Sequence, residues 1–216
     1  MIPALIVPVL NRPDLLDRLL ASLHYEIGDL LVIDNGNVVD ALPDLDCVHR
    51  SHLVKSPTNL GVPASWNLGI KMLPFAPWWM IVNSDAYFPR ASLNRLQVAA
   101  RRDALVLSAA APPWACFMVG DQVVSKVGLF DEGIFPAYFE DDDFMRRCTY
   151  WGVPIVQTGI PVEHTNSSTI HSDQRYMARN NETFTANRNY YMAKAHRGDF
   201  SDGRWDLSTR RRLSWD

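Results

Sequence analysis

Apolar stretches alternate with amphipathic ones along the first 150 residues of the chain. Residues 3–10 (PALIVPVL) are nearly all apolar, which is typical of a strand buried on both faces of a parallel sheet. Residues 11–23 then carry leucines at helical spacing behind Asn11 and Pro13, two residue types that suit the start of a helix. The chain is therefore predicted to open with a strand followed by a helix.

The same alternation continues downstream. Further strands are predicted over residues 29–37, 47–54, 78–88, 104–111, 112–120 and 153–159. Helices are predicted within residues 59–73, 92–102, 122–130, 142–152 and 172–197. Strands that alternate with helices predict an α/β fold with a mostly parallel, mixed sheet flanked by helices. We expect one domain over residues 1–198 and an irregular basic tail over residues 199–216.

Polar side chains stand where two of the predicted strands end. Ligands of open α/β sheets bind outside the carboxyl ends of the strands. Asp34 ends one strand and could accept a hydrogen bond from a nucleotide base, or it could close an Asx turn in Asp-Asn-Gly. Asn83, Ser84 and Asp85 end another strand and could supply oxygen ligands for Mg²⁺ or Mn²⁺, or they could form a plain turn.

Four consecutive acids, Glu140 to Asp143, follow an aromatic segment. Acids complement the positive end of a helix, which accounts for one or two of them but not for four. Clustered like charges are typical of functional sites, and one carboxylate could take a proton from an attacking hydroxyl. His164 is a lone histidine that could be structural, exposed or a ligand of Mn²⁺.

Composition and charge narrow the classes of protein. With 47% hydrophobic and 21% charged residues the chain is an ordinary globular one. A net charge of −3 and a pI near 6.0 give no general reason to expect nucleic-acid binding. The basic exception is a C-terminal group of arginines, which we interpret as a solvated tail: Arg204, Arg210, Arg211 and Arg212.

The cysteines and the N-terminal segment bear on location. Three widely spaced cysteines without a Cys-x-x-Cys pair argue against a disulfide framework and against a structural zinc site. The first residues lack the pattern of a signal peptide, and no apolar stretch approaches the roughly 18 residues of a membrane-spanning helix. We therefore expect a cytoplasmic protein.

The order of these motifs carries a resemblance that covers residues 3–195. The segments PVLNRP, VIDNGN, NLGVPASWNLG, VNSD and GLFDEGIFPAYFEDDDFMRR, followed by His164, resemble the inverting glycosyltransferases of family 2, which have the GT-A fold and use sugar nucleotides. The acidic segment and the ordered set are the specific parts of this resemblance. It implies a nucleoside-diphosphate sugar as donor, with a UDP-sugar as the first expectation, and Mn²⁺ or Mg²⁺ as cofactor.

The resemblance also implies roles for individual residues. Asp85 and His164 would hold the metal, with Asn83 standing at the first position of the family's D-x-D motif. Asp141 would be the catalytic base, with Glu140 in reserve. The remaining matches would bind the nucleotide sugar: Pro8, Leu10, Arg12, Asp34, Asn59, Gly61, Asn67, Asn83, Ser84 and Asp85.

Other functions remain open at this point. A nucleotidyltransferase would need a glycine-rich basic loop after the first strand, where this chain has VPVLNRP. A catalytically degenerate GT-A fold that only binds a nucleotide sugar or a glycan is the alternative, and Asn83 favours it. The acceptor could be a glycan, a protein or a modified nucleic-acid base.

Overall fold

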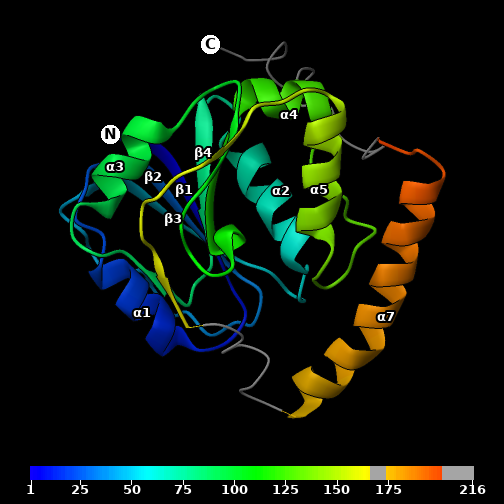
Figure 1. The fold of residues 1–216 in the computed structure, drawn as a ribbon. Coiled ribbons are helices and arrows are strands. Elements are labelled where there is room, and N and C mark those ends of the chain that lie inside the picture. The colour runs from blue at the N-terminus through cyan, green and yellow to red at the C-terminus, as the bar shows by residue number, and fades with distance from the viewer. Residues whose placement is uncertain (166–173, 201–216) are drawn as a thin grey trace, which may run out of the picture.

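The computed structural model describes residues 1–165 and 174–200, and its centre is a seven-stranded sheet (Figure 1). The strands are ordered β3-β2-β1-β4-β7-β6-β8. Their bounds are β1 (Ile2–Val9), β2 (Ile27–Asp34), β3 (Val48–Lys55), β4 (Trp78–Val82), β6 (Leu105–Leu107), β7 (Cys116–Gly120) and β8 (Ile155–Gln157). A separate two-stranded ribbon pairs β5 (Ala86–Tyr87) with β9 (Glu163–His164).

The sheet is mixed and mostly parallel, as the sequence predicts. β1 runs parallel to β2 and β4, and β2 to β3, whereas β7 runs antiparallel to both β4 and β6. Only residues 108–115 separate β6 from β7, and a parallel crossover needs about a dozen residues or more. The chain therefore turns back through a 3-10 turn, η1 (Pro113–Ala115), and pairs in the opposite sense.

Helices cover both faces of the sheet (Figure 1). Alternate residues of β1 point to opposite faces, so that Leu5 packs in one core and Ile6 in the other. The first core lies under α1 (Pro13–Ala21) and α3 (Ser92–Ala99). The second core lies under α2 (Val62–Met72), α4 (Asp121–Val127) and α5 (Glu140–Tyr150). The long helix α7 (Gln174–His196) runs outside α5.

The boundaries of several elements differ from those predicted. The helix predicted from residue 142 begins at Glu140, since all four acids of the run occupy its first turn. The strand predicted over 104–111 is limited to Leu105–Leu107, because the chain must reverse before β7. Residues 201–216 of the predicted basic tail, with its arginines, lie outside the described residues.

Two further expectations concern membranes and cysteines. None of the helices in the described part of the chain is both long enough and apolar enough to cross a bilayer. Cys47, Cys116 and Cys148 are all free, in agreement with the expected lack of a disulfide framework.

Candidate active site

The loop that follows β2 is organised by Asp34. Its fully buried carboxylate accepts hydrogen bonds from the backbone N–H groups of Gly36 and Val38 at 3.1 Å each. A third comes from Val39 at 2.9 Å. Three N–H donors hold the carboxylate in place, which is the Asx-turn role foreseen as an alternative. Contact of Asp34 with a nucleotide base stays a prediction.

This loop packs closely on the segment that follows β1. A Cβ atom at Gly36 would lie 1.6 Å from the carbonyl oxygen of Leu10, so that only glycine fits there. Pro8 and Leu10 are half-buried in this segment. Arg12 has a positive φ of 59° and forms an ion pair of 2.7 Å with Asp14. The hydrogen bond to Asp14 is the main cause of the raised pKa of Arg12, and the charge of Asp85 adds to it.

The start of α2 joins the loop after β2 to the loop before α5. The side chain of Asn35 donates to Ser65 at 2.9 Å and accepts from the backbone N–H of Leu60 at 3.2 Å. Asn59 accepts from the N–H of Gly61 at 2.9 Å, and Gly61 has a φ of 79°. The backbone N–H of Val62, the first residue of α2, donates to the carbonyl oxygen of Pro136 at 2.7 Å. The loops after β2, before α2 and before α5 therefore lie side by side.

Asn67, which the resemblance assigns to the nucleotide-sugar site, lies in the interior of the protein. It is fully buried, and its side-chain amide donates to the carbonyl of Phe130 and accepts from the N–H of the same residue, at 2.8 and 2.9 Å. It also donates to Glu132 at 2.9 Å. Asn67 therefore fixes the segment that leads toward α5.

Asp85 and His164 form a pair at the end of β4. The Oδ1 atom of Asp85 lies 2.8 Å from Nε2 of His164, and the two side chains are 10% and 5% exposed. Antiparallel pairing of β5 with β9 brings them together, because Ala86 lies opposite His164. Burial alone would lower the pKa of His164, but the hydrogen bond to Asp85 and its charge raise it.

The Asp85–His164 pair offers atoms that suit a divalent cation. A carboxylate oxygen and an imidazole nitrogen are both ligands of Mn²⁺, and a cation that binds a diphosphate takes only one or two ligands from protein. The described residues hold no group of three or more histidine, cysteine or acidic side chains that could hold a metal by themselves. Asn83 and Ser84 belong to the same turn, in which the N–H of Ala86 donates to the carbonyl of Asn83 at 3.0 Å.

Glu140 and Asp141 begin α5 on a strained stretch of backbone. Tyr138 and Phe139 both have positive φ angles, 74° and 77°, which non-glycine residues seldom adopt and which cluster at functional sites. Glu140 is 7% exposed, and its Oε2 atom is buried with no hydrogen-bond partner among the described residues. Burial, with the nearby charges of Asp141 and Asp142, raises the pKa of Glu140 to about 8. Burial also raises the pKa of Asp141, which is partly accessible to solvent.

Asp143 has a different role from the acids before it. It is fully buried, and its carboxylate pairs with Arg147 at 2.8 Å and with Lys194 at 3.1 Å. Arg147 is equally buried and donates to the carbonyls of Val127 and Leu129 at 3.0 and 2.8 Å. The acidic run therefore divides: its first two members stand at the candidate site, and its last is part of the core.

Helix α7 supplies contacts that sequence reasoning missed. Lys194 is 1% exposed and bonds Asp131 at 2.7 Å, and Tyr190 donates to the same carboxylate at 3.0 Å. Asn187 accepts from the N–H of Phe135 at 3.3 Å and donates to a carbonyl of the same loop at 2.8 Å. The signal that could have found them is their spacing, because positions 187, 190 and 194 fall on one helical face.

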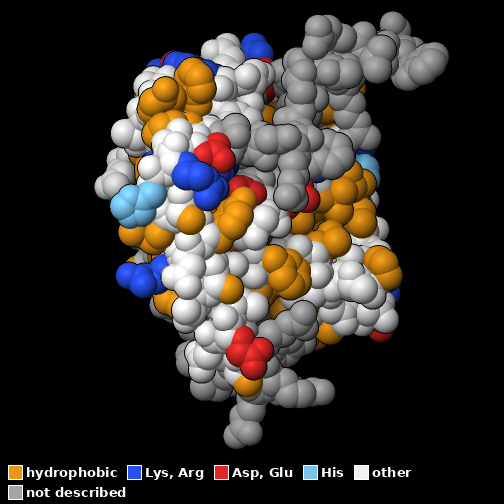
Figure 2. Space-filling view, turned by 90° about the vertical axis from the view of Figure 1, so that its right-hand side faces the viewer, with side chains coloured by type: hydrophobic (Ala, Val, Ile, Leu, Met, Phe, Trp, Pro, Cys, Tyr) orange, Lys and Arg blue, Asp and Glu red, His pale blue; other side chains and the backbone are white. Residues whose placement is uncertain are grey.

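Aromatic contacts join α7 to the segment directly before Glu140 and Asp141. The ring of Phe184 on α7 lies 5.4 Å from that of Tyr138 and 5.0 Å from that of Phe139. These are the two residues with positive φ directly before Glu140. Figure 2, which looks onto the α7 side of the molecule, shows hydrophobic side chains spread among charged ones, and Phe184, Tyr190 and Met192 are exposed members of α7.

Replacing Glu140 by glutamine is expected to make stability less dependent on pH. The carboxyl group stays protonated up to about pH 8 in the folded protein but ionises near its ordinary pKa of 4.5 when unfolded. Between these values the unfolded chain binds fewer protons, so the free energy of unfolding of the wild type falls as pH rises. Glutamine does not titrate. Urea unfolding should therefore show that Glu140→Gln gains, relative to the wild type, on the order of 3 kcal/mol between pH 5 and pH 8. A constant difference between the two proteins would contradict the burial of an ionisable group here.

The fold and the position of these residues define a class. In the seven-stranded mixed sheet β2 ends at Asp34 and β4 is followed by Asp85, and comparison with solved structures shows that this is the GT-A fold of glycosyltransferases. No protein-family model matches the chain, and no curated protein matches it either.

Three solved structures illustrate the similarity. The mannosyltransferase PcManGT from Pyrobaculum calidifontis, in complex with GDP-Man and Mn²⁺, has a TM-score of 0.64 at 15% identity over 90% of this chain and 64% of its own. TarS 1–349 from S. aureus has a TM-score of 0.57 at 16% identity over 76% of this chain and 60% of its own. GalNAc-T7, with UDP, GalNAc and Mn²⁺, has a TM-score of 0.59 at 10% identity over 76% of this chain and 44% of its own. The chain thus spans less than two thirds of each of these structures.

Proposed function

We propose that the protein is a metal-dependent, inverting glycosyltransferase that moves a sugar from a nucleoside-diphosphate sugar to an acceptor hydroxyl. The observation that carries the proposal is the buried Asp85–His164 pair, 2.8 Å apart, in a fold that has its acids Glu140 and Asp141 at the start of α5. Solved proteins of the same fold bind GDP-Man with Mn²⁺ and UDP with Mn²⁺, which supports a sugar nucleotide and a divalent cation here.

Each group has a task in this reaction. Asp85 and His164 would hold Mn²⁺ or Mg²⁺, which supplies positive charge to the departing diphosphate. The loops after β1, after β2 and before α2 would hold the nucleotide, with Arg12, which stands between β1 and α1, adding positive charge. Asp141 accepts the proton of the acceptor hydroxyl, whose oxygen forms the new bond to the anomeric carbon. The bond from that carbon to the diphosphate breaks on the opposite face, and the nucleoside diphosphate leaves with the electron pair.

Asp141 is a better candidate for the base than Glu140 at neutral pH. A base must be ionised before it can take a proton, and Glu140 with a pKa of about 8 holds its proton at pH 7. Asp141 is partly accessible, and burial raises its pKa above the ordinary value of 3.8 toward the range in which proton transfer is efficient.

A second candidate function is a degenerate GT-A fold that binds a nucleotide sugar or a glycan without transfer. The observation that favours it is Asn83, which stands where the resembled family has the first acid of its D-x-D motif. Release of nucleoside diphosphate from a sugar nucleotide in the presence of Mn²⁺ separates the two, because a binding module releases none.

Metal-dependent nucleotide binding is the first expected result. Thermal unfolding with UDP, GDP and their sugar derivatives should show a stabilising shift for one base, and that shift should require Mn²⁺. A ligand at a hundredfold excess over its Kd stabilises by about 2.7 kcal/mol. Asp85→Asn and His164→Ala should each abolish the Mn²⁺-dependent part, whereas Asp103→Asn, which alters an exposed ion pair with Arg101, should not. A nucleotide shift that persists without metal in the wild type would refute the assigned role of the pair.

A further inference from the structure

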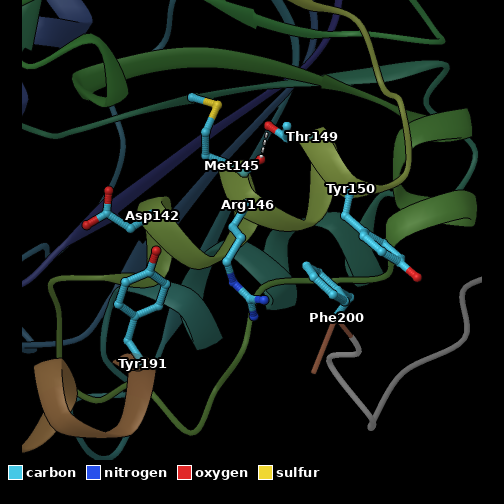
Figure 3. A pocket seen from close by; sticks show the side chains of 7 residues that line it. All are labelled: Asp142, Met145, Arg146, Thr149, Tyr150, Tyr191 and Phe200. Carbon is cyan, nitrogen blue, oxygen red and sulfur yellow. Dashed lines mark hydrogen bonds between the residues drawn. The ribbon is translucent and has the colours of Figure 1, made fainter. Parts of the chain in front are cut away.

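A pocket of about 470 Å³ lies on the outer face of α5 (Figure 3). Five of its residues, from Asp142 to Tyr150, recur along α5 at helical spacing and so form one face of the helix. Tyr191 from α7 and Phe200 complete the wall. The pocket begins one residue after the proposed base, Asp141, so a ligand that fills it reaches the acidic end of the helix.

Arg146 stands in the middle of this pocket with unused donors. Its Nη2 atom donates to Asp143 at 3.3 Å and to the carbonyl of Asp199. Its Nε and Nη1 atoms are buried and have no hydrogen-bond partner among the described residues. Buried N–H groups without a partner are costly, and more so when they carry charge, so these atoms mark a place where an acceptor oxygen belongs.

The ion pairs buried behind the pocket also bear on the charge that Arg146 brings to it. Asp131 pairs with Lys194 at 2.7 Å, and Asp143 pairs with Arg147 at 2.8 Å. Lys194 and Arg146 also contact Asp143, at 3.1 and 3.3 Å. Arg146, Arg147 and Lys194 thus share the two carboxylates of Asp131 and Asp143, which leaves this group of five side chains with a net positive charge.

Aromatic rings form the sides of the pocket. The guanidinium of Arg146 lies 4.5 Å from the centre of the Phe200 ring, and Phe200 stacks on Tyr150 at 3.7 Å. Figure 3 shows Arg146 extended between Phe200 on one side and Tyr191 on the other. Flat apolar faces beside a charged hydrogen-bonding group suit a ligand with an apolar ring face and a polar edge.

The chemistry of the wall distinguishes between ligands. Arg146 offers donors, and Asp142, exposed at the mouth, offers acceptors, so a group that both donates and accepts is matched and a purely accepting anion is not. Asp141 and Asp142 stand at this end of the helix and repel phosphate, whereas Asp143 is buried and paired with Arg147 and Lys194. Hydroxyl groups on a sugar ring satisfy both requirements, whereas a nucleic acid would bring its phosphates next to two carboxylates.

We propose that this pocket binds a neutral glycan, and that the glycan is the acceptor whose hydroxyl is presented to Asp141. The proposal rests on the proposed function and deepens it, because it names the acceptor class. Arg146 would bind ring hydroxyls through its guanidinium group, and Tyr191 would pack on a sugar face. Phe200, held between Arg146 and Tyr150, would keep the guanidinium in place.

The proposal is tested by measuring binding to an array of neutral, anionic and sulfated glycans. Single-stranded DNA and RNA are measured in the same assay. The wild-type protein should bind neutral glycans, and Arg146→Gln and Tyr191→Ala should each weaken that binding about tenfold or more, as expected for lost hydrogen bonds to a charged group and lost ring contact. Arg95→Gln, an exposed change on α3 at the opposite face of the sheet, should bind like the wild type. The Mn²⁺-dependent nucleotide shift, measured on every variant, shows that each one is folded.

The outcomes separate this proposal from the proposed function. A normal nucleotide shift with no binding to neutral glycans, or with binding that both pocket variants retain, overturns the pocket proposal and leaves the transferase intact. Preference for anionic glycans or for nucleic acid overturns it as well. Loss of both the nucleotide shift and glycan binding in the wild-type protein overturns the proposed function and the pocket proposal together.

Discussion

Replacing Asp141 by asparagine is expected to slow sugar transfer by about 10²–10⁴-fold, the usual contribution of a positioned proton acceptor. Asparagine keeps the size of the side chain but cannot take the proton of the attacking hydroxyl. The release of nucleoside diphosphate should be measured at saturating donor and acceptor, because the change then reports on the chemical step. The Mn²⁺-dependent nucleotide shift should be unchanged, since Asp141 is not assigned to the donor.

Glu140→Gln is the matched comparison for this result. At pH 7 the Glu140 side chain is already neutral, with a pKa of about 8, so glutamine imitates its resting state and transfer should be largely retained. Full activity of Asp141→Asn together with a large loss in Glu140→Gln would move the role of base to Glu140. The pH profile gives an independent check, because activity should fall on the acid side as Asp141 becomes protonated, at a pH above the ordinary 3.8.

Replacing Lys194 by methionine is expected to destabilise the fold by about 3–5 kcal/mol, the usual effect of removing one partner from a buried ionic group. Lys194 is 2% exposed at its side chain and contacts two carboxylates, Asp131 at 2.7 Å and Asp143 at 3.1 Å. Methionine keeps the length of the side chain but leaves both carboxylates without that cation. Urea unfolding gives the free-energy change directly.

A control and a double variant sharpen this prediction. Lys126→Met on α4 removes an exposed lysine and should change stability by no more than about 0.5 kcal/mol. Combining Lys194→Met with Asp131→Asn should be less harmful than the sum of the two single changes, because the pair is then removed together. A loss below about 1 kcal/mol in Lys194→Met would show that the buried contacts do not hold α7 in solution.

The sequence predicts which residues of the candidate site lie at strand ends better than it predicts the contacts of their side chains. Apolar runs bounded by polar residues locate β2 and β4, and the fold therefore places Asp34 and Asp85 at strand ends as expected. What each carboxylate contacts is decided by residues distant in the chain. Asp85 meets His164 only because β5 pairs with β9, and no local pattern predicts that pairing.

The acidic run shows the same limit. Four adjacent acids indicate a functional site, but their individual roles depend on which way each points from the helix. Asp143 faces the core, where it pairs with Arg147 and Lys194. Glu140 and Asp141 instead begin the helix directly after two residues with positive φ. Lys194 was unremarkable in sequence, since a lysine in a polar helix is usually exposed.

The large sequence separation between Lys194 and its partners also implies an order of assembly. Its partners Asp131 and Asp143 precede it by 63 and 51 residues, so they are synthesised well before their cation. During synthesis at about 5–20 residues per second, the sheet and α5 are complete for several seconds while two carboxylates still lack their lysine. We therefore expect the loop before α5, which leads to Glu140 and Asp141, to reach its final form only when α7 has emerged and docked. A nascent chain that ends before α7 would then lack a finished candidate site.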